Sequence, residues 1–210
     1  MIKQSLLILS LFLLTFQGWA QTSSGVIGMP ELNILYRGYN NLIEVLSAGP
    51  NGTSNIKMVG EGCVVTEHTD TKGKGWPKKF IVAVKTNERF AEVHMLDGDE
   101  LVRNWRFRVS NMPIPSLYFG AASSGGGCSR SSSKLFIKYP PEIALKAPFR
   151  IEDWECELLD KKTSGSGSIL NKDVMVALQS VPRDTEFHVV VTCVGVDGIK
   201  RKIGGVFIVK

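Results

Sequence analysis

The sequence lacks the residue patterns that enzymes usually carry. Only three of its 210 residues are His, namely His68, His94 and His188, and they stand at none of the spacings typical of metal sites. It contains no G-x-S-x-G and no Gly-Lys-Ser/Thr ending to its glycine-rich stretch. These absences predict a protein that is not an enzyme and that holds no cofactor or metal.

An excess of charge of one sign is also absent. The chain carries 25 Lys and Arg against 20 Asp and Glu, a net charge of +5, and the basic residues are scattered along it. A nucleic-acid-binding protein usually gathers such residues into one strongly positive patch. We therefore expect no nucleic-acid partner.

Long apolar runs are missing except near the N-terminus. Lys3 precedes the apolar stretch Leu6–Phe16, and Gly18-Trp19-Ala20 places small residues where signal peptidase cleaves. This stretch is about half of the roughly 20 residues needed to span a bilayer. We therefore predict a signal peptide of residues 1–20, cleaved between Ala20 and Gln21, and no transmembrane segment after cleavage. The protein is expected to be periplasmic or secreted.

Past this segment the apolar residues recur with a period of two, which is typical of half-buried β-strands. Ala91, Val93 and Met95 form the apolar face of one such strand, whose other face carries Glu92 and His94. The first half of the chain is predicted to contain further strands at Asn33–Arg37, Leu42–Leu46, Ile56–Val59, Cys63–Thr66, Phe80–Lys85 and Leu101–Val109.

The strand Leu101–Val109 contains one residue out of phase. Arg103 falls on the face that Trp105 and Phe107 make apolar. A charged residue on a buried face costs free energy unless the chain turns it outward. This position therefore predicts a bulge or a strand start.

A stretch with two prolines, Asn111–Pro115, interrupts the strand pattern and marks a domain boundary. After it comes the Gly/Ser-rich stretch Gly120–Ser133, and turns are predicted at Ser164–Ser168. A hairpin is predicted across Val196–Ile199. The predicted strands of this half are Lys134–Lys138, Phe149–Leu159, Val174–Gln179, Phe187–Val196 and Lys202–Val209.

The strand pattern as a whole predicts a mainly all-β protein. No amphipathic helix is evident in the sequence. Short strands at close spacing favour two tandem small β-sandwich domains of the Ig-like kind after the signal peptide, residues 21–110 and 111–210.

Two catalytic arrangements deserve comparison with simpler explanations. Glu155 and Glu157 stand on one outward face, as a carboxylate pair for acid/base chemistry would. A solvated strand face explains the same alternation. Cys128 beside a histidine is the other enzymatic alternative. Neither lies in a recognised catalytic motif, so we expect no catalytic residues.

The four cysteines are Cys63, Cys128, Cys156 and Cys193. The strand phase points Cys156 and Cys193 inward in the same predicted domain, and an exported domain can keep a disulfide. A Cys156–Cys193 bridge is one alternative, and a bridge from Cys128 to one of them is another. Buried free thiols are the third, since connectivity cannot be deduced from sequence.

Three segments resemble the C-terminal periplasmic region of the GldM/PorM family, in that family's order. Glu31–Val45 is similar to its M-N-V-L-Y-R-G-V-D-N-P-I repeat, Trp105–Pro115 to F-R-V-K-x-[VL]-P-x-P, and Val196–Lys210 to its closing hairpin. Asn40 and Asn41 suit a corner in left-handed backbone. The matching residues, which we interpret as fold markers, are Asn33, Leu35, Tyr36, Arg37, Gly38, Asn41, Phe107, Pro113, Pro115, Asp197 and Gly198.

The resemblance implies a role in the gliding-motility and type IX secretion machinery of Bacteroidetes. It implies two consecutive β-rich periplasmic domains, similar to the third periplasmic and the C-terminal domains of GldM, that contact other envelope proteins. The expected function is therefore a non-enzymatic protein-interaction module. The alternative is an exported protein that binds glycan or peptidoglycan, with Trp76, Tyr39 or Tyr118 as stacking platforms.

Overall fold

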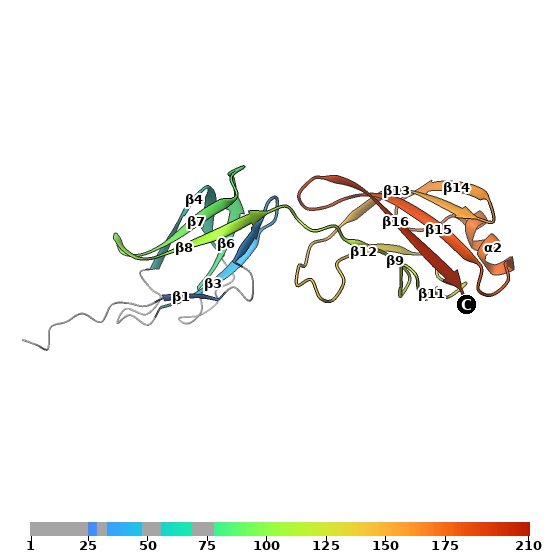
Figure 1. Ribbon diagram of the computed structural model, residues 1–210, viewed down its shortest axis with the longest axis horizontal. Helices are drawn as coiled ribbons and strands as arrows, with labels where there is room; N and C mark the ends of the chain where they lie inside the picture. The colour runs from blue at the N-terminus through green and yellow to red at the C-terminus, as the bar shows by residue number, and fades with distance from the viewer. Residues whose placement is uncertain (1–24, 29–32, 48–55, 69–77) are drawn as a thin grey trace, which may run out of the picture. The chain divides into compact units, whose positions relative to one another are not determined.

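The computed structural model describes residues 25–28, 33–47, 56–68 and 78–210. The chain divides into two compact units, drawn in blue to green and in yellow-green to red (Figure 1). The first consists of residues up to Leu35 and Asn40–Val109, and the second of Tyr36–Tyr39 and Ser110–Lys210. The predicted signal peptide, with Ala20 and Gln21, lies outside the described residues. No helix in the described part is long and apolar enough to cross a membrane.

Two four-stranded sheets form the first unit. One has the order β1 (Gly25–Gly28), β3 (Asn41–Ser47), β6 (Lys78–Val84) and β5 (Cys63–Glu67). The other has the order β2 (Ile34–Tyr36), β8 (Glu100–Ser110), β7 (Phe90–Asp97) and β4 (Ile56–Glu61).

The core of the first unit contains the apolar faces of both sheets. Val93 and Met95 of β7 and Val82 of β6 are fully buried, while Glu92 and His94 stay partly exposed. The predicted period-two alternation of β7 is therefore confirmed. Burial of each such side chain contributes roughly 1.5–3 kcal/mol, which makes this alternation the main determinant of the sheet's register.

Strand β8 contains the bulge that Arg103 predicted. Met95 of β7 pairs with Arg103 and Leu96 pairs with Leu101, so Val102 is the extra residue. Val102 packs against the core, and the guanidinium of Arg103 lies 5.4 Å from the centre of the Trp105 ring. The extra residue shifts the alternation by one for Leu101, which is exposed, while Arg103 stays in phase with Trp105 and its own side chain is exposed.

The second unit combines a five-stranded and a three-stranded sheet. The larger has the order β11 (Gly127–Cys128), β16 (Lys200–Val209), β15 (Glu186–Val194), β13 (Arg150–Leu158) and β14 (Lys161–Ser166). The smaller has the order β10 (Ala122–Ser123), β9 (Ser116–Phe119) and β12 (Leu135–Lys138). β15 and β16 form the predicted hairpin across Val196–Ile199.

Aromatic rings join the two sheets of the second unit. Phe119 of β9 meets Phe187 of β15 edge-to-face at 5.5 Å between ring centres, and it lies 5.8 Å from Phe207 of β16. Trp154 of β13 is 1% exposed in the same core. Each unit is thus a core enclosed between two sheets, and the prediction of an all-β, sandwich-type fold is confirmed.

Two local predictions were wrong in this unit. Val174–Gln179, predicted as a strand, lies in helix α2 (Lys172–Ser180), whose first turn is capped by Asn171 Oδ1 accepting from the backbone N–H of Val174 at 3.0 Å. Val174 and Leu178, one turn apart, are its buried residues. Ser164–Ser168, predicted as turns, lies partly in β14 because the ladder to β13 continues through Ser166.

Truncation of Phe187 tests the packing of the second unit. Phe187→Ala removes a fully buried ring that contacts Phe119 and Phe207. We expect a loss of about 3–5 kcal/mol in the free energy of unfolding. Val190→Ala, on the outward face of the same strand, should cost about 1 kcal/mol or less. Urea denaturation measures both, and equal losses would contradict the assigned faces.

Candidate functional site

The edge strand β14 is the candidate functional site. It is the last strand of its sheet and pairs only with β13 among the described strands (Figure 1). An edge strand keeps a row of backbone N–H and C=O groups that its own sheet does not bind. Such a row can accept an extended segment of another chain as an additional strand.

The hydrogen bonds to β13 show which residues of β14 face outward. The N–H of Gly167 donates to Glu152 O of β13 at 2.8 Å. Backbone groups alternate in direction along an antiparallel strand. The N–H and C=O groups of Lys162, Ser164 and Ser166 therefore point away from β13.

The middle of β14 is held in place by a glycine. Gly165 pairs with Trp154 of β13, and the indole ring occupies the space where a side chain of residue 165 would begin. Any larger residue here would displace a ring that is 1% exposed in the core. This contact keeps the strand flat on the core while its outer side stays open.

A shallow hollow of about 310 Å³ lies on the outer face of the sheet next to this edge. Val190, 39% exposed, is its apolar part. Nζ of Lys162 lies 3.5 Å from Oε2 of Glu157, so two opposite charges meet across β13 and β14. The residues that line it are Glu155, Cys156, Glu157, Lys162, Thr163, Ser164, His188 and Val190.

The hollow contains both members of the predicted carboxylate pair. Glu155 and Glu157 share the outward face, as predicted, and His188 stands opposite Glu157 on β15. Lys162 neutralises Glu157, and the hollow is open to solvent. An open groove with one apolar and several polar side chains can contact a protein segment.

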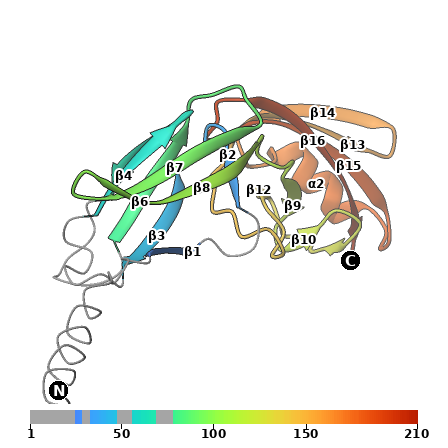
Figure 2. The same ribbon diagram turned by 60° about the vertical axis from the view of Figure 1, so that its left-hand side comes forward.

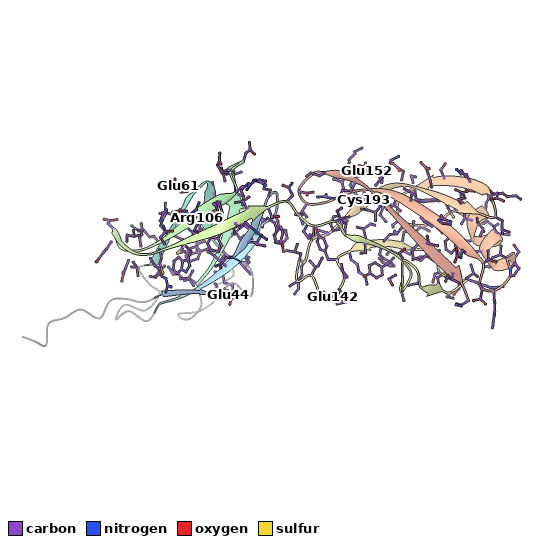
Figure 3. The ribbon with its side chains drawn as sticks, viewed as in Figure 1. Glu44, Glu61, Arg106, Glu142, Glu152 and Cys193 are labelled. Atoms are coloured by element: carbon purple, nitrogen blue, oxygen red, sulfur yellow. The ribbon has the colours of Figure 1, made fainter. Side chains whose placement is uncertain are left out.

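A charged network lies near the start of β13. Glu152 is the extra residue of a bulge in the pairing of β13 with β15. Its carboxylate accepts from Lys200 at 2.8 Å and from Arg150 at 2.9 Å. The hydrogen bond from Lys200 lowers the pKa of Glu152, and the same bond raises the pKa of Lys200. Figure 3 labels Glu152 at this position.

A second hollow, of about 540 Å³, lies beside the small sheet. Tyr118, Tyr139 and Glu142 contribute to it, and Nζ of Lys138 lies 4.3 Å from the centre of the Tyr118 ring. Tyr118 is 9% exposed. Of the other two predicted stacking residues, Trp76 lies outside the described residues, and Tyr39 groups with the second unit.

The first family-like segment contains two left-handed residues, Asn33 (φ 44°) and Gly38 (φ 70°). Asn40 and Asn41 are not left-handed, contrary to expectation. Asn41 is instead a buried strand residue whose Nδ2 donates to Val82 O at 3.0 Å. Its side chain satisfies a backbone carbonyl of β6. The left-handed residue of the corner between β2 and β3 is Gly38, and glycine adopts this conformation without strain.

Gly38 lies against the hairpin between β15 and β16. A Cβ on Gly38 would stand 2.5 Å from Cβ of Asp197, so only glycine fits. Nη1 of Arg201 donates to Oδ1 of Asp197 at 2.9 Å, and Nη2 binds the other oxygen. This hydrogen-bonded pair lowers the pKa of Asp197. Gly198, at φ 72°, completes the turn.

The remaining matching residues also take part in packing and turns. Leu35 and Phe107 are fully buried in the first unit, and Pro115 is buried in the second. Arg37 donates from its backbone N–H to Ser110 O at 2.9 Å and from Nη1 to Oδ1 of Asn111 at 3.2 Å. Tyr36 belongs to the same segment, and Pro113 O accepts from the hydroxyl of Tyr139 at 3.1 Å.

All four cysteines are free and buried, so a Cys156–Cys193 disulfide is a wrong alternative in this structure. Cys156 stands opposite Val189 and Cys193 opposite Ile151, four residues farther along β15. At about 3.3 Å per residue this separation is about 13 Å, beyond the roughly 7 Å that a disulfide can bridge. Cys128 pairs with Val209, near the other end of the sheet.

Burial raises the pKa of each of the four thiols, that of Cys156 to about 11. The folded protein therefore holds the Cys156 proton at pH values where the unfolded chain, with a pKa near 9.0, releases it. The stabilisation from this burial is complete below pH 9 and decreases as the pH rises towards about 11. Protonated, buried thiols are poor nucleophiles, which argues against a catalytic Cys128.

Comparison with known proteins gives no family assignment. No protein-family model matches the chain, and no curated protein matches it. Among solved structures, domains 6–7 of the surface layer protein SbsC align with it at 7% sequence identity and a TM-score of 0.32. The alignment covers 89% of this chain and 98% of that one. A likeness this remote supports no conclusion about function.

Thiol titration tests the state of the cysteines. Without reductant at pH 8, an aromatic disulfide reagent should not react with the folded protein and should count four thiols per chain in guanidinium chloride. Burial and the raised thiol pKa values are the reason. Fewer thiols in the unfolded, unreduced protein would show that a disulfide forms after all.

Proposed function

We propose that the protein is an exported, non-enzymatic interaction module of the bacterial envelope that binds a partner protein along β14. In this proposal it acts as the C-terminal periplasmic domains of GldM and PorM do, within gliding motility or type IX secretion. The three segments that resemble GldM and PorM support a role in gliding motility or type IX secretion. The N-terminal signal pattern supports a periplasmic or secreted location.

The observation that carries the proposal is the open outer row of β14. Lys162, Ser164 and Ser166 offer backbone donors and acceptors to a partner strand, and each hydrogen bond formed contributes about 0.5–1.5 kcal/mol. The adjacent hollow receives side chains of that strand, so the backbone supplies affinity and the hollow supplies specificity. Val190 and the Lys162–Glu157 pair are its recognition elements.

A proline at residue 164 tests strand addition directly. Ser164→Pro removes an N–H that points away from β13, and an edge strand tolerates proline at such a position. We expect the variant to fold and to bind its envelope partner about tenfold or more weakly, because one hydrogen bond is lost and the ring blocks close approach. Pull-down from envelope fractions, followed by affinity measurement with the recovered component, measures this.

Ser164→Ala is the matched control, since it keeps the backbone N–H and changes the same side chain. It should recover the same gliding or secretion components as the wild type. Recovery of none of these components by the wild type, or equal binding by the proline and alanine variants, would overturn the proposal.

Glycan binding is a second candidate, favoured by the hollow beside the small sheet. Tyr118 and Tyr139 provide aromatic surface there, and Ser116, Ser123 and Lys138 provide polar groups. Aromatic surface with a few convergent polar groups is a common arrangement in small-ligand sites. Glu142, labelled in Figure 3, adds a carboxylate that can accept from sugar hydroxyls.

Co-sedimentation with purified peptidoglycan tests this candidate. If glycan binds in the hollow, Lys138→Ala and Glu142→Gln should each weaken binding by about tenfold, which corresponds to about 1.4 kcal/mol. Lys161→Ala, an exposed lysine outside the hollow, should leave binding unchanged. No sedimentation of the wild type, or equal binding by all three variants, would remove the candidate.

A further inference from the structure

The outer face of the sheet β2-β8-β7-β4 carries three metal-ligating side chains at one place. Glu61 is the last residue of β4, and Glu92 and His94 lie on β7. One oxygen of each carboxyl and one ring nitrogen of the imidazole all lie within 4.8 Å of one another. Nε2 of His94 is 3.9 Å from Oε2 of Glu61. Figure 3 labels Glu61 on β4.

The strand register places these residues together. Glu61 stands directly opposite Glu92, and His94 is the next residue on the same face of β7. Figure 2 shows β4, β7 and β8 side by side, as their pairing requires. Because all three residues stand on paired strands, the ligand atoms are brought together by the backbone ladder itself.

The facing carboxylates of Glu61 and Glu92 favour the binding of a cation between them. Two carboxylates directly opposite each other in an antiparallel pair destabilise it. Arg106 stands opposite Glu92 on β8, yet its guanidinium lies over the Phe90 ring, 4.0 Å from its centre. Lys57, also on β4, pairs with Asp99 at 3.7 Å.

No ion pair within the described residues joins a Lys or Arg to either carboxylate of this cluster. Glu61 pairs there with His94 alone, and the histidine is charged only when protonated. With a neutral imidazole, two facing carboxylates and a nitrogen donor therefore converge at one place, the donor set of a divalent cation.

A neighbouring amide orients one of the ligands. Nδ2 of Asn104 on β8 donates to Oε2 of Glu92 at 2.9 Å. Hydrogen bonds of this kind hold ligating carboxylates in place, and their loss typically weakens metal binding 10–100-fold. Asn104 is thus a positioning residue, and it leaves the second oxygen of Glu92 to serve as a ligand.

We propose that Glu61, Glu92 and His94 form a zinc-binding site. One imidazole nitrogen with two carboxylate oxygens suits Zn²⁺, whereas Ca²⁺ and Mg²⁺ prefer oxygen ligands throughout. At bond lengths of about 2.1 Å, ligand atoms of a tetrahedral zinc lie about 3.4 Å apart. Binding therefore requires the ligand atoms, which lie within 4.8 Å of one another, to move to that spacing. Three protein ligands leave the fourth position to water, and the ion ties β4 to β7.

Calorimetric titration of the untagged full chain with zinc chloride tests the proposal. We expect one zinc per chain, no comparable binding of calcium or magnesium, and a rise in the unfolding temperature with zinc. His94→Ala and Glu61→Gln should abolish this binding, and Asn104→Ala should weaken it by about tenfold. The buried thiols do not compete in the folded state.

His188→Ala is the matched control, because His188 is an exposed histidine that stands opposite a single glutamate, Glu157, in the second unit. It should bind zinc as the wild type does, and circular dichroism shows whether each variant is folded. Absence of binding by the wild type at millimolar zinc, undiminished binding by folded His94→Ala, or equal loss in His188→Ala would overturn the proposal.

Discussion

Contact among Phe119, Phe187 and Phe207 is the interaction on which the second unit depends. One ring comes from the small sheet and two from adjacent strands of the large one, and their centres lie 5.5 to 5.8 Å apart. A one-residue slip of β15 would turn Phe187 to solvent and expose the core. The rings therefore set the register of β15, and through it that of β13 and β14. The outward positions of Glu155, Glu157 and His188 follow from this register.

An open sheet ends in an edge strand, and β14 carries features that limit unwanted pairing at that edge. Lys161 and Lys162 are exposed at its start, and charged side chains on an edge discourage pairing between identical copies. Gly165 under Trp154 keeps the strand seated on the core. In the proposed function, these charges disfavour pairing with a second copy, while a carboxylate of the partner strand could meet Lys161. Proteins that select one partner commonly combine attraction and repulsion in this way.

The segments that resemble GldM and PorM lie at turns and in cores. Gly38 touches Asp197, Asp197 binds Arg201, and Asn41 binds a carbonyl of the neighbouring strand. Two of the three segments thus meet although they stand at opposite ends of the sequence. Residues with such roles preserve a fold, whereas the exposed surfaces of β14 and of the Glu61 cluster are free to differ between proteins with that fold. Function must therefore be argued from those surfaces.

The sequence by itself determined the all-β class, most strands, the bulge near Arg103 and the outward face of Glu155 and Glu157, because these follow from a local period of two. It also showed Glu92 and His94 on one face. It did not reveal α2, because the local pattern of Val174–Gln179 also fits a strand. The helix depends on the cap at Asn171 and on burial of Leu178 in the core. Only the tertiary structure decided that β14 is an edge, that Glu61 stands opposite Glu92, and that Cys156 and Cys193 lie too far apart to bond. Each of these depends on which strands pair and in which register, and the long-range packing that selects the pairing leaves no signal in the local pattern.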